Sequence, residues 1–130
     1  MSALAWVFVV KIAVTLVGWC GPLLLMPSST LVTLGIPAGV NQMFVRLLGW
    51  AYLSLCVGYV VGLRAVLNHE PALGAVVAGI VSNAGASVLL AYFGFRGAWS
   101  EWSGALRFAL WASMLFTAAI AVLLYVCGIR

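Results

Sequence analysis

The chain has 130 residues, of which 66% are hydrophobic and only 6% are charged. Soluble domains have roughly 45–50% apolar and about 25% charged residues, so this composition excludes a soluble domain and predicts an integral membrane protein. The net charge of +4 comes from basic residues dispersed between apolar runs, which excludes a nucleic-acid-binding surface. We therefore expect the partners to be the lipid bilayer and other membrane subunits or further copies of this chain, with no nucleic acid.

Four apolar runs are each long enough to cross a bilayer as a helix, which takes about 20 residues. They cover approximately residues 4–26, 43–63, 72–95 and 105–127. The connections between the last three runs are short, and short connections make neighbouring helices antiparallel. The sequence therefore predicts an all-α fold, a single four-helix transmembrane domain over residues 1–130 with both termini on one side. We expect a multi-pass protein of a bacterial inner or cytoplasmic membrane, but three basic residues on each side leave its orientation open.

The first run contains the stretch VFVVKIAVTLV, in which Lys11 is the only charged residue. If the hydrocarbon begins at Val7, Lys11 lies about 6 Å inside it at ~1.5 Å per residue, and its side chain can reach the headgroups near Trp6. We therefore expect Lys11 to snorkel. If the helix instead ends at Gly21 and Pro22, Lys11 lies nearer the middle and needs a partner, which no acidic residue in the four runs supplies.

Between the first two runs lies the segment PSSTLVTLGIPAGVNQ, which is too apolar for a free loop. We expect a short segment lying in the membrane interface. Its apolar side chains are Leu31, Val32, Leu34 and Ile36. Arg46 follows at the start of the second run, where its guanidinium can either snorkel to a lipid phosphate or bind an acidic ligand with two parallel hydrogen bonds.

Turn and interface signals mark the other two connections. Pro71 suits the first turn of the third helix, with Asn68 or Glu70 near its N-cap. Aromatic residues of the kind that anchor helices at the headgroup level occur near both ends of the predicted bundle. These are Trp6 and Tyr125 near the termini, and Trp99 and Trp102 in the third connection.

Small residues at three- and four-residue spacing form one face of each of the last three runs. They are Ala51, Ser54, Gly58 and Gly62; Ala75, Gly79, Asn83 and Ser87; and Ala109, Ser113, Thr117 and Ala121. Such faces let helices approach closely, so we expect them to serve helix packing, within the chain or across a subunit boundary. Asn83 lies near the bilayer midplane, where its amide needs partners, either on another helix or on a ligand in a central cavity.

No catalytic constellation is apparent. Glu70 and Glu101 are expected on opposite faces of the membrane, too far apart for an acid/base pair, and the single histidine, His69, lies in a connection. The three cysteines have no CxxC spacing, which argues against a metal site or a redox pair. They are Cys20, Cys56 and Cys127. We therefore expect no catalytic residue and no metal ligand, and an enzyme acting alone is disfavoured.

The stretch MFVRLLGWAYLSLCVGYVVGLRAV, which includes Arg46, Gly49 and the pair Gly58 and Tyr59, resembles the second helix of small DoxX-like four-helix membrane proteins. The preceding LLLMPSSTLVTLGIP is similar to the interfacial link of those proteins, and together the two stretches cover about 50 of the 130 residues. The resemblance implies a four-span architecture and, as in some of those proteins, a membrane subunit of a quinone-linked oxidoreductase. The fourth run lacks the acidic residue that such proteins often carry there.

Three functional hypotheses follow. The first is an accessory or structural subunit of a larger membrane complex, with no catalytic site of its own. The second is a small oligomeric transporter or binder of an anionic or amphipathic ligand, contacted by Lys11, Arg46 and Asn83. The third is a subunit that shares a quinone, haem or pigment with a partner through Trp19, Trp50 and His69; no cofactor motif is evident in the chain itself.

Overall fold

The computed structural model describes residues 1–130 and contains helices but no strands. The elements are α1 (Ala3–Thr15), the π-helix η1 (Leu16–Cys20), α2 (Gly21–Leu25), α3 (Ser28–Thr33), α4 (Gln42–Leu67), α5 (Leu73–Phe95) and α6 (Gly104–Gly128). The first three run on as one helix, so four helices are long and apolar enough to cross a membrane. The predicted all-α, four-span fold is confirmed, and the chain is a small polytopic membrane protein.

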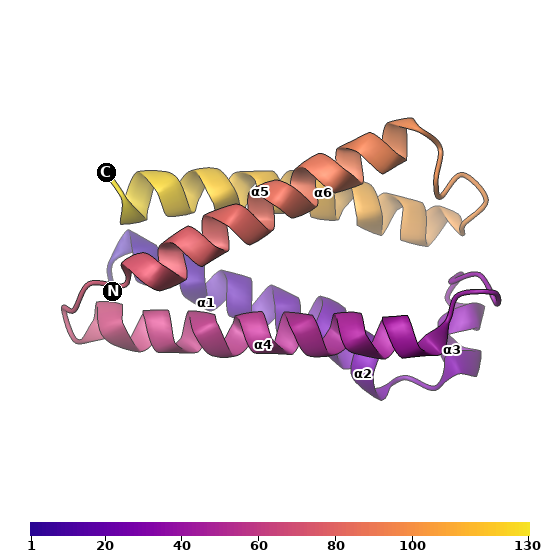
Figure 1. Cartoon of the computed structure of the whole chain (residues 1–130), viewed down its shortest axis with the longest axis horizontal. Helices are drawn as coiled ribbons and strands as arrows, with labels where there is room; N and C mark the ends of the chain where they lie inside the picture. The colour runs from indigo at the N-terminus through magenta and orange to yellow at the C-terminus, as the bar shows by residue number, and fades with distance from the viewer.

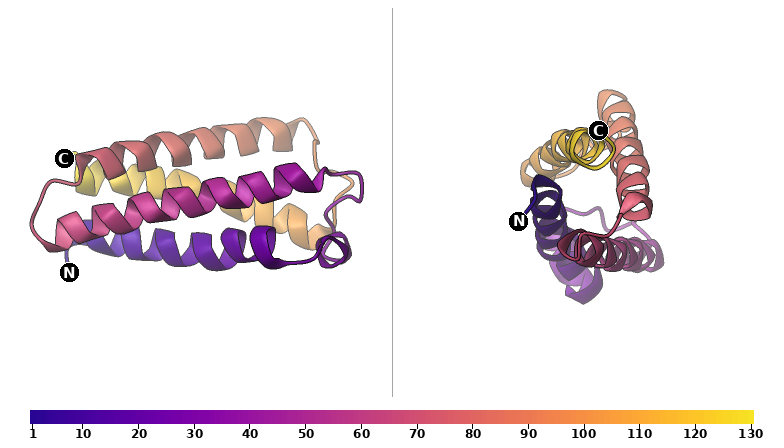
Figure 2. Two further views of the ribbon diagram at one scale, coloured as in Figure 1. Left: turned by 60° about the horizontal axis from the view of Figure 1, so that its bottom comes forward. Right: turned by 90° about the vertical axis from the view of Figure 1, so that its left-hand side faces the viewer.

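The four long helices form a ring in which α1 neighbours α4 and α6, and α5 neighbours α4 and α6. Both termini lie at one end of the bundle and α3 lies at the other (Figure 1). α5 starts beside the end of α4 and diverges from it toward the α3 end, which the end-on view also shows (Figure 2). The bundle is therefore tight at the end that holds the termini and wider at the α3 end.

The first span continues through Pro22, so an end at Gly21 and Pro22 is ruled out. Pro22 has no backbone N–H and disturbs a regular α-helix. The chain absorbs the misfit by widening the preceding turn into η1, where the Gly21 N–H donates to the carbonyl of Leu16, five residues earlier. Such π-turns are a common adjustment inside helices. The helix then ends at Met26, whose ψ of 136° is extended.

Arg46 holds this helix end in place. The last carbonyls of a helix have no partner within it. Here Arg46 Nη1 donates to the Leu23 carbonyl at 2.5 Å and Nη2 donates to the Met26 carbonyl at 2.6 Å. The planar guanidinium suits two acceptors at once. One N–H of each terminal nitrogen therefore goes to the backbone, and binding of a lipid phosphate or an acidic ligand remains a prediction for the other N–H groups.

The segment between the first two spans contains the short helix α3. Its Leu31 side chain is fully buried and packs with Leu23 and Val45, whereas Val32 and Leu34 are exposed. This one-sided burial fixes α3 against the ends of α2 and α4 and leaves its outer apolar side chains free to contact lipid.

α4 ends at Leu67 rather than at the predicted residue 63. The helix closes with a C-terminal turn in which the His69 N–H donates to the Val66 carbonyl and the Glu70 N–H donates to the Ala65 carbonyl. His69 occupies the left-handed position of this turn, with φ of 60°, a place usually taken by glycine. The helix therefore continues beyond the apolar run, because the closing turn, and not the end of the apolar residues, stops it.

The start of α5 also differs from the prediction. Ala72 is its N-cap and makes no side-chain capping bond. Pro71 precedes the helix instead of lying in its first turn, and Asn68 is the C-cap of α4 rather than an N-cap for α5. The sequence signal was ambiguous because one five-residue connection has to end one helix and begin the next.

The small residues of α4 divide between two environments. Gly62 is buried at the α4–α5 contact, where an added Cβ would collide with the Cβ of Ala75 and lie 3.2 Å from Cζ of Phe8. Gly58, one turn earlier, is exposed and has no atom within 4 Å of an added Cβ. Only Gly62 of this pair therefore contacts another helix of the chain.

The small residues of α5 and α6 face the interior. An added Cβ at Gly79 would lie 2.6 Å from Cδ1 of Leu124, so Gly79 lets α5 and α6 approach closely. The Ser87 hydroxyl donates to the Met114 carbonyl on α6 at 3.1 Å. Ser113 faces a central cavity. These contacts occur at the α5–α6 interface, the most extensive one in the bundle.

We expect Gly62→Ala to destabilise the protein by about 1–3 kcal/mol, the usual cost of overpacking a core. Ala75 contributes a Cβ that cannot rotate away, so the helices must move apart. Gly58→Ala is the matched control, because it gives α4 the same gain in helix propensity without a clash. Unfolding of both variants by heat in mild detergent measures the difference; equal stability would show that α4 and α5 do not touch at Gly62.

We expect Arg46→Met to destabilise the protein by about 2 kcal/mol, because each hydrogen bond from a charged donor contributes about 1.5–3 kcal/mol and two carbonyls lose their donor. Arg107→Met, at an exposed position in the first turn of α6, controls for the loss of one positive charge. The same thermal assay applies. A loss no larger than that of Arg107→Met would mean that the Arg46 clamp contributes nothing.

Candidate functional site: an intramembrane cavity

A cavity of about 590 Å³ lies at the centre of the bundle, and all four long helices line it. Ligand pockets typically measure about 300–1,000 Å³ and are mostly apolar with a few polar groups. This cavity matches that description, since 14 of its 20 lining residues are hydrophobic. Its polar residues lie near the middle of the spans, and its aromatic residues lie mainly toward the α3 end.

Lys11 is the only charged residue that lines the cavity. Its side chain is only 9% exposed, and its Nζ lies 5.6 Å from the centroid of the Phe116 ring. The expectation that Lys11 snorkels to the headgroups is therefore wrong. Lys11 is buried because it lies on the face of α1 that points into the bundle, with the buried residues Phe8 and Thr15. The point where the first helix ends does not determine its burial.

The contact with Phe116 compensates only part of the cost of burying an ammonium group, since a cation–π interaction contributes about 0.5–2 kcal/mol. No carboxylate lines the cavity, and both glutamates, Glu70 and Glu101, are exposed in the connections. The ammonium group, with three N–H donors, therefore has an aromatic neighbour but no counterion.

Thr15 adds an unpaired hydroxyl one turn from Lys11. Residues four apart lie on the same face of a helix, and both of these side chains line the cavity. A helical threonine can donate to the carbonyl four residues earlier, but the Thr15 hydroxyl is buried with no hydrogen-bond partner. The hydroxyl oxygen itself is closed off from the cavity, so it can reach a molecule there only when the Thr15 side chain rotates.

Asn83 approaches the cavity from α5, diagonally across the ring from α1. It is 2% exposed, and its Nδ2 donates to the Gly79 carbonyl at 2.7 Å and to the Tyr59 hydroxyl at 3.1 Å. The Tyr59 hydroxyl also exchanges a hydrogen bond with the Ser82 hydroxyl at 3.1 Å. These bonds use both amide hydrogens, whereas Oδ1 is buried and has no partner. Asn83 therefore joins α4 to α5 and retains one free acceptor.

The end of the cavity nearest α3 is lined by aromatic side chains. Trp19 of η1 packs against Tyr52 of α4, with ring centroids 5.8 Å apart. Trp99, in the connection between α5 and α6, is buried and packs edge-on with Trp111, with ring centroids 5.9 Å apart. Gly94 makes room for it, because an added Cβ would lie 2.6 Å from Cζ2 of Trp99. The prediction that Trp99 is a membrane anchor is therefore wrong; it is part of the cavity wall.

The cavity reaches the bilayer side of the bundle where α4 and α5 diverge. Leu48 of α4 and Leu89 and Phe93 of α5 line the cavity, yet 47%, 57% and 48% of their surfaces are exposed. Side chains that belong to both the cavity and the outer surface mark its edge. This edge is apolar, so it faces the hydrocarbon rather than water. By the same criterion, Val14 of α1 and Ala112 of α6, which also line the cavity and are exposed, mark a second edge between those two helices.

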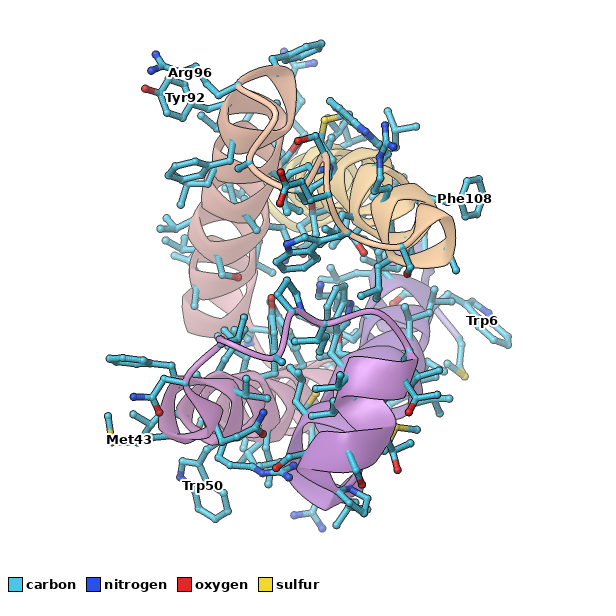
Figure 3. All side chains as sticks on the ribbon, turned by 90° about the vertical axis from the view of Figure 1, so that its right-hand side faces the viewer. Trp6, Met43, Trp50, Tyr92, Arg96 and Phe108 are labelled. Atoms are coloured by element: carbon cyan, nitrogen blue, oxygen red, sulfur yellow. The ribbon has the colours of Figure 1, made fainter.

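Other large side chains, most of them aromatic, point away from the bundle. Figure 3 shows Trp6, Met43, Trp50 and Phe108 directed outward, and Tyr92 beside Arg96 at the end of α5, with 5.7 Å between the guanidinium carbon and the ring centroid. Trp6 is 56% exposed, as an interfacial anchor requires.

The residues of the shared-cofactor hypothesis do not converge. Trp50 points outward from α4 (Figure 3). Trp19 lines the cavity, and His69 lies exposed in the connection between α4 and α5, at the other end of the bundle. No three histidine, cysteine or acidic side chains form a possible metal site. Cys20 and Cys56 are buried free thiols, and Cys127 is a partly buried one.

Sequence patterns did not place three residues in the cavity: Thr15, Tyr59 and Trp99. Thr15 was detectable as the residue one turn after Lys11, once the burial of Lys11 is known. Tyr59 belongs to the stretch that resembles DoxX-like proteins, but its bond to Asn83 depends on how α4 and α5 meet. Trp99 carries no local signal, because its burial depends on the path of the connection.

The chain matches no protein-family profile, no curated protein and no solved structure. The four candidate membrane spans agree with the architecture of DoxX-like proteins. No family match shows that the chain belongs to that family.

We expect Lys11→Met to stabilise the ligand-free protein by about 1–3 kcal/mol, because a lysine near the middle of a span costs about 2.5–3.5 kcal/mol and the Phe116 contact offsets part of that cost. Thermal unfolding in detergent, beside Arg107→Met as the control for lost charge, measures the effect. A Lys11→Met variant less stable than the parent would show that Lys11 is a structural residue.

Proposed function

We propose that this protein binds an amphipathic ligand, with its polar end at Lys11, Thr15 and Asn83 and its apolar part along the aromatic end of the cavity. The observation that carries the proposal is a buried ammonium group with no carboxylate counterion in a cavity that Thr15 and Asn83 also line, each with one side-chain oxygen that has no hydrogen-bond partner. This is the second of the hypotheses from the sequence, with Arg46 assigned to the helix clamp instead.

The energetic argument concerns groups that folding alone leaves unsatisfied. A buried polar group without a partner costs about 1–3 kcal/mol, and a charge in a membrane span costs more. Three such groups facing one cavity add their costs at one place. Polar residues inside a membrane span usually mark a functional site, and a ligand that pairs with these groups returns part of the cost on binding.

The distribution of the lining favours a ligand with two chemically different ends. Lys11, Thr15 and Asn83 lie near the middle of their spans, whereas Trp19, Phe93 and Trp99 line the end near α3. A small inorganic anion would leave this apolar end empty, and a pure hydrocarbon would leave the ammonium group unpaired. An amphipathic molecule satisfies both ends.

The accessory-subunit hypothesis has a separate source of support. The outer face of α4 carries Ala51, Ser54 and Gly58, all exposed, and small residues allow close approach of another helix. The small residues of α5 and α6 face the interior of the chain, so they no longer argue for a partner. Gly58→Leu should shift the protein to a smaller species in mild detergent if this face binds a partner helix, and leave its size unchanged if it does not.

We expect the purified protein to retain one class of amphipathic molecule and to lose it when the cavity is filled. Ala86→Phe places a ring into the cavity from α5, and Ala78→Phe places the same ring on the exposed face of that helix as the control. Native mass spectrometry, followed by organic extraction of the purified proteins, measures the retained molecule. The same lipid profile for the parent and both variants would contradict the proposal.

A further inference from the structure

We infer that the ligand is a single-chain carboxylate, and that it reaches the cavity from the bilayer between α4 and α5. This inference rests on the proposed function, since it names the ligand of the same cavity. Four features of the site carry it: the number of charges, the set of hydrogen-bond donors and acceptors, the volume, and the position of the apolar edge.

The charge count selects a ligand with one negative charge. Lys11 is the only charged residue that lines the cavity. Arg46 does not line the cavity, and its two terminal nitrogens donate hydrogen bonds to the Leu23 and Met26 carbonyls. A phosphate monoester carries about −1.5 to −2 charges at neutral pH and is usually met by arginine clusters. A carboxylate carries one charge and is neutralised by one ammonium group.

The free donors suit a carboxylate as well. Its two oxygens can accept from the Lys11 ammonium group and, once the Thr15 side chain rotates toward the cavity, from the Thr15 hydroxyl, which has no other partner. A carboxylate has no hydrogen to donate to Oδ1 of Asn83, so that acceptor stays free. The Lys11 ammonium group then has its counterion, and no further charge is required.

The volume limits the size of the apolar part. A methylene group occupies about as much space as a water molecule, whose share of liquid volume is about 30 Å³. A cavity of about 590 Å³ therefore holds roughly twenty such groups, enough for the head and chain of one fatty acid. A two-chain lipid would have to leave most of its hydrocarbon outside.

The apolar edge at Leu48, Leu89 and Phe93 gives such a molecule a path from the bilayer. A single-chain carboxylate already resides in the bilayer, so it can pass between α4 and α5 head first, and its chain never has to enter water. Trp19 and Trp99 then contact the chain, and the head lies deepest, at Lys11.

The test measures binding of radiolabelled oleate to the purified full chain in lipid nanodiscs. Methyl oleate, with the same chain and no charge, and oleyl phosphate, with a different head group, serve as competitors. We expect about one equivalent of oleate to bind, with both competitors weaker by about tenfold or more, as for the loss of a charge-assisted hydrogen bond. Lys11→Met should weaken oleate binding by a similar factor, and Arg107→Met should leave it unchanged.

The outcomes separate this inference from the proposed function. Equal binding of oleate and methyl oleate, or no effect of Lys11→Met, overturns the carboxylate assignment but leaves the cavity as a binding site if Ala86→Phe still abolishes binding. Tighter binding of oleyl phosphate also overturns it. If none of the three probes binds in a way that Ala86→Phe removes, both proposals fail. Thermal unfolding of Lys11→Met, expected to be at least as stable as the parent, shows that lost binding is not lost folding.

Discussion

The central constraint in this structure is that Lys11 is buried inside the bundle while no carboxylate lines the cavity beside it. In hydrocarbon, polar groups must find partners within the protein. Most polar groups of the spans do so: Asn83 Nδ2 reaches Gly79 and Tyr59, Ser87 reaches Met114, and Arg46 reaches the end of the first helix. Lys11 has the ring of Phe116 and the Cys56 thiol nearby, but no hydrogen bond and no carboxylate. This charge without a counterion makes the cavity at the centre of the bundle a candidate binding site.

The shape of the bundle explains why there is space beside that charge. At the end that holds the termini, Gly62 and Gly79 bring α4, α5 and α6 into close contact. At the other end, Trp99 and Trp111 fill the space beside Gly94, and α5 diverges from α4 (Figure 1). Small residues at one end and large aromatic ones at the other produce a wedge, and the cavity occupies its wider part. The clamp formed by Arg46 fixes the first helix to α4 at this wider end.

The sequence was sufficient for the architecture because hydropathy and length determine it directly. Four runs of about 20 apolar residues allow little besides four spanning helices, and all four were located to within a few residues, except that α4 continues to Leu67. The position of Asn83 within the third run also predicted its place near the middle of a span. These properties are local, so a single sequence contains them.

The site was less accessible, because it depends on which helix faces meet. Lys11 has the same neighbours in the sequence whether it faces lipid or the interior, and the amphipathic signal of α1 is weak because nearly all its residues are apolar. Arg46 binds carbonyls 20 and 23 residues earlier, and Trp99 is buried by the fold of its connection. Pro22 suggested a helix end, but a π-turn absorbed it. In each case a contact distant in the sequence outweighed the local pattern.

The account depends on the Lys11 ammonium group lying inside the bundle, and the chain allows a direct measurement because Lys11 is its only lysine. Selective ¹⁵N-lysine labelling in lipid nanodiscs gives a single side-chain Nζ signal by nuclear magnetic resonance. The account predicts proton contacts from this group to the Phe116 ring, slow exchange with water, and a change of the signal when oleate is added. Contacts to lipid headgroups, with rapid exchange and no contact to an aromatic ring, would contradict it.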